Sequence, residues 1–240
     1  MENNIKEEFI STLSHEIRTP LTSIKGFSQT MLNSWDKLSE EKKKEFTGII
    51  LNQSQRLINL VENVLNVAKI DSNSNNLVLT KINVNNIMQS CINVIQMAHK
   101  DYKFNFEKSK NELFILSDND KTQQILLNIL DNAVKYSVNS NIIDIKTYNN
   151  NEYNVFSITN YGNYIEESNY EKIFEKFYRV SSYISSTTQG SGLGLYIAKS
   201  LVESMKGKIQ ILSSEKDKYC TFNIYLPVFE VETMTKNIGV

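Results

Sequence analysis

A helical pattern of apolar residues runs through the first third of the chain, from Ile5 to Ile70. In its first half the apolar positions fall on one stripe at the ~100° per residue of an α-helix. They are Ile10, Leu13, Ile17, Leu21, Ile24 and Met31. A cluster of turn-forming and helix-capping residues interrupts the pattern between Asn33 and Ser39. The pattern therefore predicts a helical hairpin.

The second arm of this hairpin keeps a near-heptad rhythm over about thirty residues, which is about 45 Å of helix at ~1.5 Å per residue. The positions that follow the rhythm are Phe46, Ile50, Gln53, Leu57, Leu60 or Val61, Val64 and Val67 or Ala68. A hairpin of this length cannot bury two apolar stripes by itself. Two hairpins that form a four-helix bundle can, so we predict a homodimer through this segment.

After the polar sequence DSNSNN, from Asp71 to Asn76, the pattern changes to grouped strands and helices. We predict strands at 77–82, 102–106, 113–116, 142–148, 153–159, 208–212 and 219–226, and helices at 84–100, 120–136 and 193–205. This order favours an α+β sandwich with helices on one face of a mixed sheet. The predicted domains are residues 1–71 and 77–228, with a linker at 72–76 and a tail at 229–240.

Composition and charge exclude several classes of protein. Among 240 residues, 26 Lys and Arg balance 27 Asp and Glu, so no basic field exists to hold nucleic acid or an anionic membrane. Cys91 and Cys220 lie in apolar segments without CxxC spacing, which excludes a disulfide framework and a recognisable zinc site. No apolar stretch has the length of a membrane span, and the polar start is not a signal peptide. We expect a cytoplasmic chain.

Candidate chemistry first appears on the first predicted helix. His15 projects roughly 170° away from the apolar stripe, and Thr19, one turn later, points the same way. A neutral imidazole is a nucleophile when a neighbour holds the proton of one ring nitrogen, and Glu16 is a candidate for that role. Pro20 has no N–H for the Glu16 carbonyl and predicts a kink just past His15. The alternative is a solvated surface histidine beside an ordinary salt-bridging glutamate.

Two further segments carry candidate phosphate chemistry. In LLNILDNAVKYS the spacing places Asn128, Asn132 and Lys135 on one polar face beside Tyr136, where amide oxygens suit Mg²⁺ and a lysine neutralises phosphate. In GSGLGL, at 190–195, alternate glycines let backbone N–H groups approach an anion at the start of a helix. The preceding sequence SSYISSTT is predicted to be a lid. The alternatives are a plain polar face in an Asn-rich chain and a plain glycine connector.

Four motifs of the chain resemble the boxes of sensor histidine kinases of two-component systems. FISTLSHEIRTPLTSIKGF resembles their H-box, LLNILDNAVKYS their N-box, IFEKFYR their F-box and GSGLGLYIAK their G2 box. The motifs follow the family order and spacing over nearly the whole chain. The resemblance implies an ATP:protein-histidine phosphotransferase, in which a HisKA dimerisation and phosphoacceptor domain precedes a HATPase_c ATP-binding domain of the Bergerat type.

The resemblance also implies roles for individual residues. His15 matches the autophosphorylated histidine, Glu16 its acid/base partner, and Thr19 the residue that positions water for dephosphorylation of the partner. The other matches form the nucleotide site: Asn132 as Mg²⁺ ligand, Asn128, Lys135 and Arg179 as phosphate or metal-shell contacts, Tyr136 as pocket wall, Asn160 and Gly162 near the adenine, and Gly190, Gly192, Leu193 and Gly194 around the phosphates. The phosphohistidine would pass its phosphoryl group to an aspartate of a response regulator.

One motif departs from the family pattern. Where the family has a DxGxG box, this chain reads NYGNYI, with Asn160 at the aspartate position and Tyr164 at the second glycine. The family's aspartate accepts a hydrogen bond from the adenine amino group. The Asn160 oxygen can still accept it, but the bond is then neutral and of roughly half the strength, so we expect weaker ATP binding. Tyr164 adds bulk that either narrows the pocket or restricts this loop.

Three functional hypotheses follow from these residues. The first is an active kinase that phosphorylates His15 and then a response regulator. The second is a weak kinase that acts mainly as a phosphatase of its regulator, and the third is a non-catalytic dimeric scaffold that docks a regulator. Because only fourteen residues precede His15, we expect either the cytoplasmic part of a cell-membrane sensor kinase, whose sensor segment is absent from this chain, or a transmitter without an input domain of its own. We favour the first.

Overall fold

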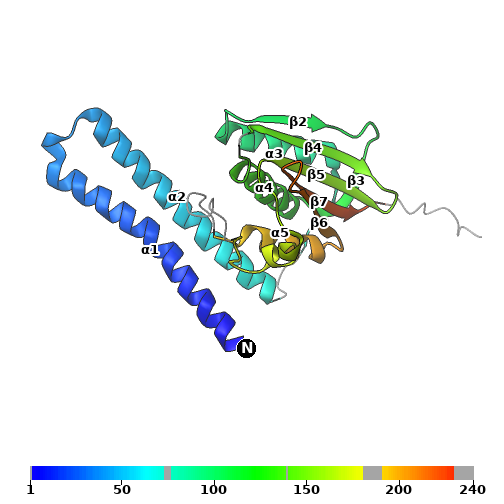
Figure 1. The fold of residues 1–240 in the computed structure, drawn as a ribbon, viewed down its shortest axis with the longest axis horizontal. Helices are drawn as coiled ribbons and strands as arrows, with labels where there is room; N and C mark the ends of the chain where they lie inside the picture. The colour runs from blue at the N-terminus through cyan, green and yellow to red at the C-terminus, as the bar shows by residue number, and fades with distance from the viewer. Residues whose placement is uncertain (1, 73–76, 139, 181–190, 230–240) are drawn as a thin grey trace, which may run out of the picture. The chain divides into compact units, whose positions relative to one another are not determined.

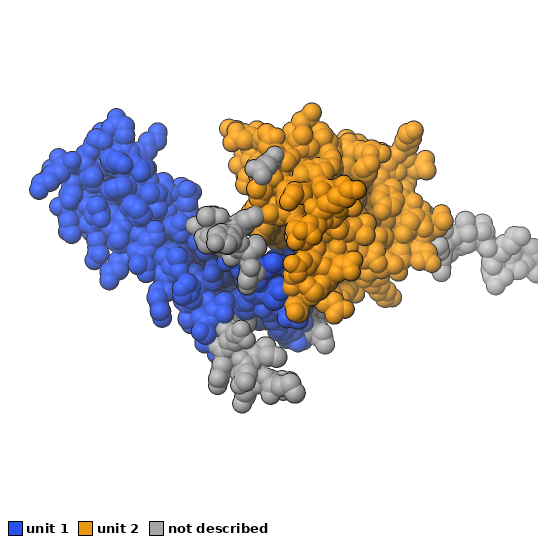
Figure 2. Space-filling model, viewed as in Figure 1, with its two compact units in different colours: residues 1–75, 175–197 blue, residues 76–174, 198–240 orange. Residues whose placement is uncertain are grey.

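A computed structural model describes residues 2–72, 77–138, 140–180 and 191–229, with side chains from Ile10 onward. The chain separates into two compact units (Figure 2). Unit 1 contains residues 1–75 and 175–197, and unit 2 contains residues 76–174 and 198–240. Gly190 and the predicted lid lie outside the described residues, as do most of the predicted linker and tail.

The predicted helical hairpin is confirmed in unit 1. Its arms are α1 (Glu2–Ser34) and α2 (Glu40–Asp71), joined by the short 3₁₀ helix η1 (Trp35–Lys37) (Figure 1). Helix α1 continues through Pro20 as one helix. Within the part of the chain that the structure describes, no helix has both the length and the apolar character needed to cross a membrane.

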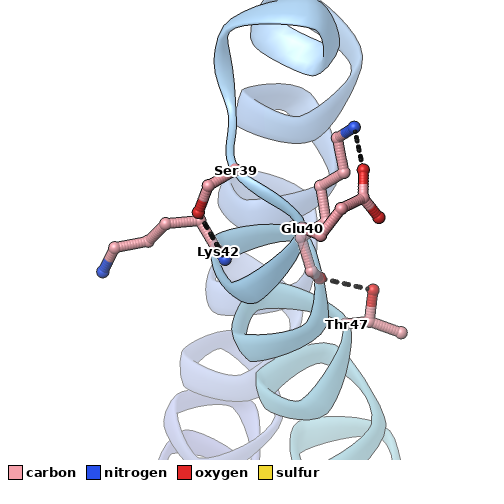
Figure 3. Close-up of polar contacts among 5 residues, drawn as sticks. Ser39, Glu40, Lys42 and Thr47 are labelled. Atoms are coloured by element: carbon pink, nitrogen blue, oxygen red, sulfur yellow. Dashed lines mark hydrogen bonds and ion pairs between the residues drawn. The ribbon is translucent and has the colours of Figure 1, made fainter.

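The turn of the hairpin ends where Ser39 caps α2. The Ser39 hydroxyl accepts a hydrogen bond from the N–H of Lys42 at 3.3 Å (Figure 3). In the same turn Glu40 and Lys43 form an ion pair at 2.7 Å, and the Thr47 hydroxyl donates to the Lys43 carbonyl at 2.8 Å. The first N–H groups of a helix have no acceptor within the helix, and the side-chain oxygen of Ser39 supplies one. This explains why α2 begins here.

The two arms pack along the apolar positions of α2 that the heptad rhythm predicts. Leu60 and Val67 are buried, and the rings of Phe27 and Phe46 contact each other at a centroid distance of 5.0 Å. The stripe of α1 is only partly covered, since Ile10 and Leu21 stay exposed in the single chain. A second apolar face therefore remains uncovered on the hairpin.

Unit 2 contains the predicted mixed sheet. Its five strands are arranged in the order β2 (Lys103–Glu107), β4 (Ile142–Asn149), β5 (Tyr153–Tyr161), β7 (Tyr219–Pro227) and β6 (Lys208–Ser214). Strands β2 and β4 are parallel, and the other neighbours are antiparallel. A separate antiparallel pair joins β1 (Leu79–Asn83) and β3 (Phe114–Asp118).

Helices α3 (Val84–Ala98) and α4 (Asn119–Lys135) lie on one side of this sheet (Figure 1). The core between the layers is apolar and includes Met88, Ile125, Leu126, Ile129, Leu130, Ile143, Ile145, Phe156 and Ile158. Helix α5 (Gly194–Ser204) starts in unit 1 and enters unit 2 at Ala198. The α+β fold class is thus confirmed. Between β5 and α5, where no regular element was predicted, lie the short helices η2 (Glu167–Asn169) and η3 (Lys172–Phe174).

The start of α4 is fixed by the Asp118 carboxylate at the end of β3. Its two oxygens accept hydrogen bonds from the N–H groups of Lys121, at 3.1 Å, and Val78, at 2.9 Å. Burial opposes ionisation of Asp118, but these backbone N–H groups overcome it and hold the pKa of the carboxyl below its usual value. The negative cap therefore persists at neutral pH and anchors the helix that carries the candidate nucleotide residues.

Candidate functional site

His15 lies on the exposed face of α1, as the helical pattern predicts. Thr19, one turn later, is exposed as well, and its hydroxyl donates to the His15 backbone carbonyl at 3.1 Å. Pro20 is buried and has no N–H to offer the preceding turn. The imidazole of His15 is therefore accessible to a reacting group from outside the hairpin.

Glu16 is held by a partner that the sequence did not reveal. Its carboxylate accepts a hydrogen bond from Arg56 of α2 at 3.1 Å, and both side chains are largely shielded, with 18% and 23% exposed. Among the described residues, no hydrogen bond joins the side chains of Glu16 and His15. Arg56 fixes the carboxylate beside His15 in sequence. Arg56 and Glu16 are 40 positions apart in the sequence, so no local motif could indicate this pair.

Helix α4 brings together the predicted polar constellation in unit 2. Asn128 and Asn132 are half-buried. The Asn132 side chain makes no hydrogen bond with any residue that the structure describes, so its amide is available to a ligand. Lys135 is exposed and forms an ion pair with Asp131 at 2.5 Å. The i,i+4 spacing of Asp131 and Lys135 is typical of an ion pair on a helix surface.

The carbonyl oxygen of Tyr136, just past the end of α4, accepts two side-chain amides. Asn163 donates to it at 3.1 Å and Asn160 at 3.4 Å. Asn160 lies within β5, between Ile143 of β4 and Cys220 of β7, and is only 2% exposed. The structure thus joins Tyr136 and Asn160, which the resemblance assigns to one pocket, and adds Asn163.

Gly162 occupies a position that only glycine fits. Its φ is +116°, and a Cβ atom would lie 2.0 Å from the Val138 carbonyl oxygen. Two residues later, the Tyr164 hydroxyl is hydrogen-bonded to the Glu215 carboxylate, which raises the pKa of Tyr164 above its usual value. The partner of Tyr164 thus lies in the turn between β6 and β7.

In unit 1 the end of the IFEKFYR motif meets the glycine-rich motif. The N–H of Phe177 donates to the Gly192 carbonyl at 3.0 Å. Gly192 has a φ of +68°, and a Cβ there would lie 2.7 Å from the Phe177 backbone. Leu193 is fully buried, and Gly194 begins α5. Arg179 is half-buried in the same segment.

A second cluster in unit 1 was not foreseen from the sequence. The Asp71 carboxylate at the end of α2 forms an ion pair with Lys176 at 2.6 Å and accepts a hydrogen bond from the Tyr196 hydroxyl at 2.9 Å. Burial works against the charge on Asp71, but the two donors prevail and keep the pKa of the carboxyl below its usual value. Asp71 therefore remains an anchor for the residues around Lys176 at neutral pH.

Two family models match the chain. The model described as "His Kinase A (phospho-acceptor) domain" matches residues 5–73. The model described as "Histidine kinase-, DNA gyrase B-, and HSP90-like ATPase" matches residues 117–230. The first match contains the hairpin with His15, and the second contains α4, β5 and the glycine-rich motif.

Curated relatives extend over nearly the whole chain. It is 34% identical to the signal transduction histidine-protein kinase ArlS of Staphylococcus haemolyticus, over 92% of this chain and 48% of that protein. The corresponding protein of Staphylococcus aureus (strain USA300) is 33% identical over 92% of this chain and 49% of its own length. The chain therefore spans about half the length of the curated relatives it matches.

Solved structures show a similar fold. The histidine kinase ThkA in complex with the response regulator protein TrrA matches 94% of this chain and 63% of that one, with a TM-score of 0.70 and 26% identity. ShkA in complex with AMPPNP matches 92% of this chain and 46% of that one, with a TM-score of 0.67 and 25% identity. Two matching domains in this order, together with these relatives, show that the chain belongs to the histidine kinases and carries a HisKA domain and an ATP-binding HATPase_c domain.

Proposed function

We propose that this chain uses ATP to phosphorylate His15 and then passes the phosphoryl group to an aspartate of a response regulator. In the first step an imidazole nitrogen attacks the γ-phosphorus, the bond to the bridging oxygen of ADP breaks, and Glu16 takes the imidazole proton. The supporting observation is the exposed His15 next to a glutamate that Arg56 holds in place, in a chain that also has an ATP-binding domain.

Residues of α4 and β5 would hold the nucleotide. Asn132 fits a Mg²⁺ ion, because its half-buried amide oxygen is not engaged by any described residue and Mg²⁺ takes few protein ligands beside phosphates and water. When bound, Mg²⁺ would neutralise charge on the phosphates. Asn128 and Lys135 would contact phosphate oxygens, and Tyr136 would line the pocket. The amide oxygen of Asn160 would accept a hydrogen bond from the adenine amino group.

The segment from Phe177 to Gly194 would serve the phosphates. Arg179 would stabilise charge on the γ-phosphate, and the backbone N–H groups of Gly190, Gly192, Leu193 and Gly194 would cradle the phosphate chain at the start of α5. The close backbone contact between Phe177 and Gly192 supports this role, because it fixes the shape of the described part of the segment.

The test is incubation of the chain with Mg²⁺ and γ-labelled ATP. We expect label on the protein that acid removes and base preserves, as for a phosphorus–nitrogen bond to histidine. A parallel reaction with α-labelled ATP should leave no label after denaturation, which separates a covalent phosphoryl group from bound nucleotide. A folded dimer that takes up no γ-label at millimolar ATP would refute the kinase proposal.

A phosphatase of the regulator is the second candidate function. It is favoured by Thr19, which lies exposed one turn from His15, and by the neutral Asn160 in place of an aspartate, which weakens ATP binding. Loss of phosphate from a phosphorylated regulator without ATP turnover would support this function. If the chain shows no labelling, no nucleotide binding and no dephosphorylation, the remaining hypothesis is the dimeric docking scaffold.

The hairpin would form the homodimer through exposed apolar residues of α2. Leu51, Ile58 and Leu65 follow each other at intervals of seven residues on α2 and are 67%, 50% and 55% exposed in the single chain. This is the spacing of a helical-bundle seam. The HisKA match supports dimerisation through this domain.

Charges on this seam should separate the protomers. The double variant Ile58→Glu and Leu65→Glu is expected to be monomeric in light scattering, because four carboxylates would be brought together in the bundle core. Circular dichroism should show that the helices persist. The control is Leu32→Glu at the end of α1, which is 81% exposed and should remain dimeric. A double variant that stays dimeric would place the interface on another face.

The partner and the setting of the chain follow from its relatives. The solved ThkA complex contains the response regulator TrrA, which supports a response-regulator receiver domain as the partner here. The curated relatives are about twice as long as this chain. We therefore propose that this chain is the cytoplasmic part of a cell-membrane sensor kinase and that a separate segment carries the sensor.

A further inference from the structure

A single ion pair joins the two arms of the hairpin in the part of the chain that the structure describes. It links Arg56 of α2 to Glu16 of α1 at 3.1 Å, and both side chains are largely shielded from water. Elsewhere the buried positions of α2 are apolar, at Leu60 and Val67. The cost of removing two charges from water largely offsets their attraction, so such a pair adds little to stability. Its position, one residue after His15, points to a role in the reaction instead.

The ion pair occupies only one of the two carboxylate oxygens of Glu16. The Nη2 atom of Arg56 donates to Oε2, and no described residue donates to Oε1. This second oxygen is not enclosed, because every fully buried side-chain polar atom of the described residues has a partner. An arginine that held both oxygens would block the carboxylate as a proton acceptor. Arg56 instead fixes the side chain and leaves one acceptor oxygen accessible.

The position of Glu16 matters because a general base has to lie within hydrogen-bond distance of the proton that it removes. A glutamate side chain without a partner on a helix surface samples several rotamers, so it spends only part of the time near a given neighbour. The hydrogen bond from Arg56 removes this freedom before the reaction begins. Freedom that is lost in advance does not add to the barrier of the chemical step.

We propose that Arg56 is a positioning residue for the phosphorylation of His15 and that it acts through Glu16. This inference rests on the proposed function, which assigns the imidazole proton to Glu16. While one ring nitrogen of His15 attacks the γ-phosphorus, the proton of the other ring nitrogen passes to Oε1 of Glu16. ADP leaves with the electron pair of the broken bond. Arg56 keeps its hydrogen bond to Oε2 throughout and exchanges no proton.

The test measures the initial rate at which the whole chain takes up label from γ-labelled ATP with Mg²⁺, over a range of ATP concentrations. Arg56→Gln is expected to lower the rate at saturating ATP by about 10- to 100-fold. The ATP concentration that gives half the maximal rate should not change, because none of the proposed nucleotide contacts lies on the hairpin. Arg56→Lys should retain most of the rate, since the ion pair uses one donor and a lysine supplies one.

Two double variants separate the other possible roles of Arg56. In a Glu16→Gln background, Arg56→Gln should have no further effect, because no carboxylate is left to position. A further loss in that background would show that Arg56 acts on the phosphates directly and would overturn the inference. The exchanged pair, Glu16→Arg with Arg56→Glu, should keep the hairpin folded in circular dichroism but should not restore labelling. Restored labelling would mean that the ion pair only stabilises the hairpin, and would also overturn the inference.

The control is Lys42→Gln, which removes the cation of another ion pair on α2, the one with Glu45 at 2.8 Å. This variant should take up label at the rate of the unaltered chain. If Arg56→Gln labels as fast as the unaltered chain or faster, the inference is overturned and the proposed function stands. If the unaltered chain takes up no label, the proposed function and the inference are both overturned.

Discussion

Replacing His15 with glutamine is expected to abolish uptake of the γ-phosphoryl group from ATP. Glutamine is similar in size and polar, so the exposed face of α1 should tolerate it, and circular dichroism should be unchanged. It has no nitrogen lone pair that can attack phosphorus, because its amide nitrogen is conjugated with the carbonyl group. Binding of ADP should persist, since the nucleotide residues lie on other elements. The measurement is acid-labile label per protomer, compared with the unaltered chain.

The chain provides a matched control for this experiment, because it has only two histidines. The second, His99, follows α3, where its backbone N–H donates to the Ile95 carbonyl at 2.9 Å and its ring contacts Tyr102. His99→Gln should label like the unaltered chain. If the label persists in His15→Gln but disappears in His99→Gln, His99 is the phosphorylated residue, and the proposed role of His15 is rejected.

Much of the fold could be predicted because its signals are local. The turn between Asn33 and Ser39 is marked by residues that cap helices, and Ser39 does cap α2. The alternating patterns of β4 and β5 gave those strands almost to the residue. The first strand of unit 2 begins later than predicted, at Leu79, because the N–H of Val78 donates to the Asp118 side chain and the backbone pairing with β3 starts only at Leu79.

The parts that escaped prediction depend on contacts between distant segments. Arg56 meets Glu16 only because the two arms of the hairpin pack in one particular register. Asn163 reaches the Tyr136 carbonyl across 27 positions of sequence. Phe177 adopts a φ of +63°, which a bulky residue rarely does. The chain's motifs indicate candidate site residues, but not the neighbours that hold them.

Gly162→Ala is expected to destabilise unit 2 strongly. The Gly162 backbone is fixed on both sides: its N–H donates to the Lys218 carbonyl at 2.7 Å, and a β-bridge pairs it with Ser137. An added methyl group would overlap the Val138 carbonyl oxygen at 2.0 Å, and the φ of +116° is itself unfavourable for alanine. We expect a loss of about 3–5 kcal/mol in the free energy of unfolding, or roughly 8 to 15 °C in Tm.

Hydrogen exchange by mass spectrometry would locate this loss. In Gly162→Ala, exchange should accelerate in β5 and β7, while the hairpin should keep its protection because it belongs to the other compact unit. Gly26→Ala is the matched control, since a Cβ there meets no atom within 4 Å and alanine favours a helix interior by up to about 1 kcal/mol. Equal stability of Gly162→Ala and the unaltered chain would contradict the tight packing against Val138. In the NYGNYI motif, Asn160 and Tyr164 replace the family's aspartate and second glycine. The packing against Val138 explains why the first glycine, Gly162, cannot be replaced in the same way.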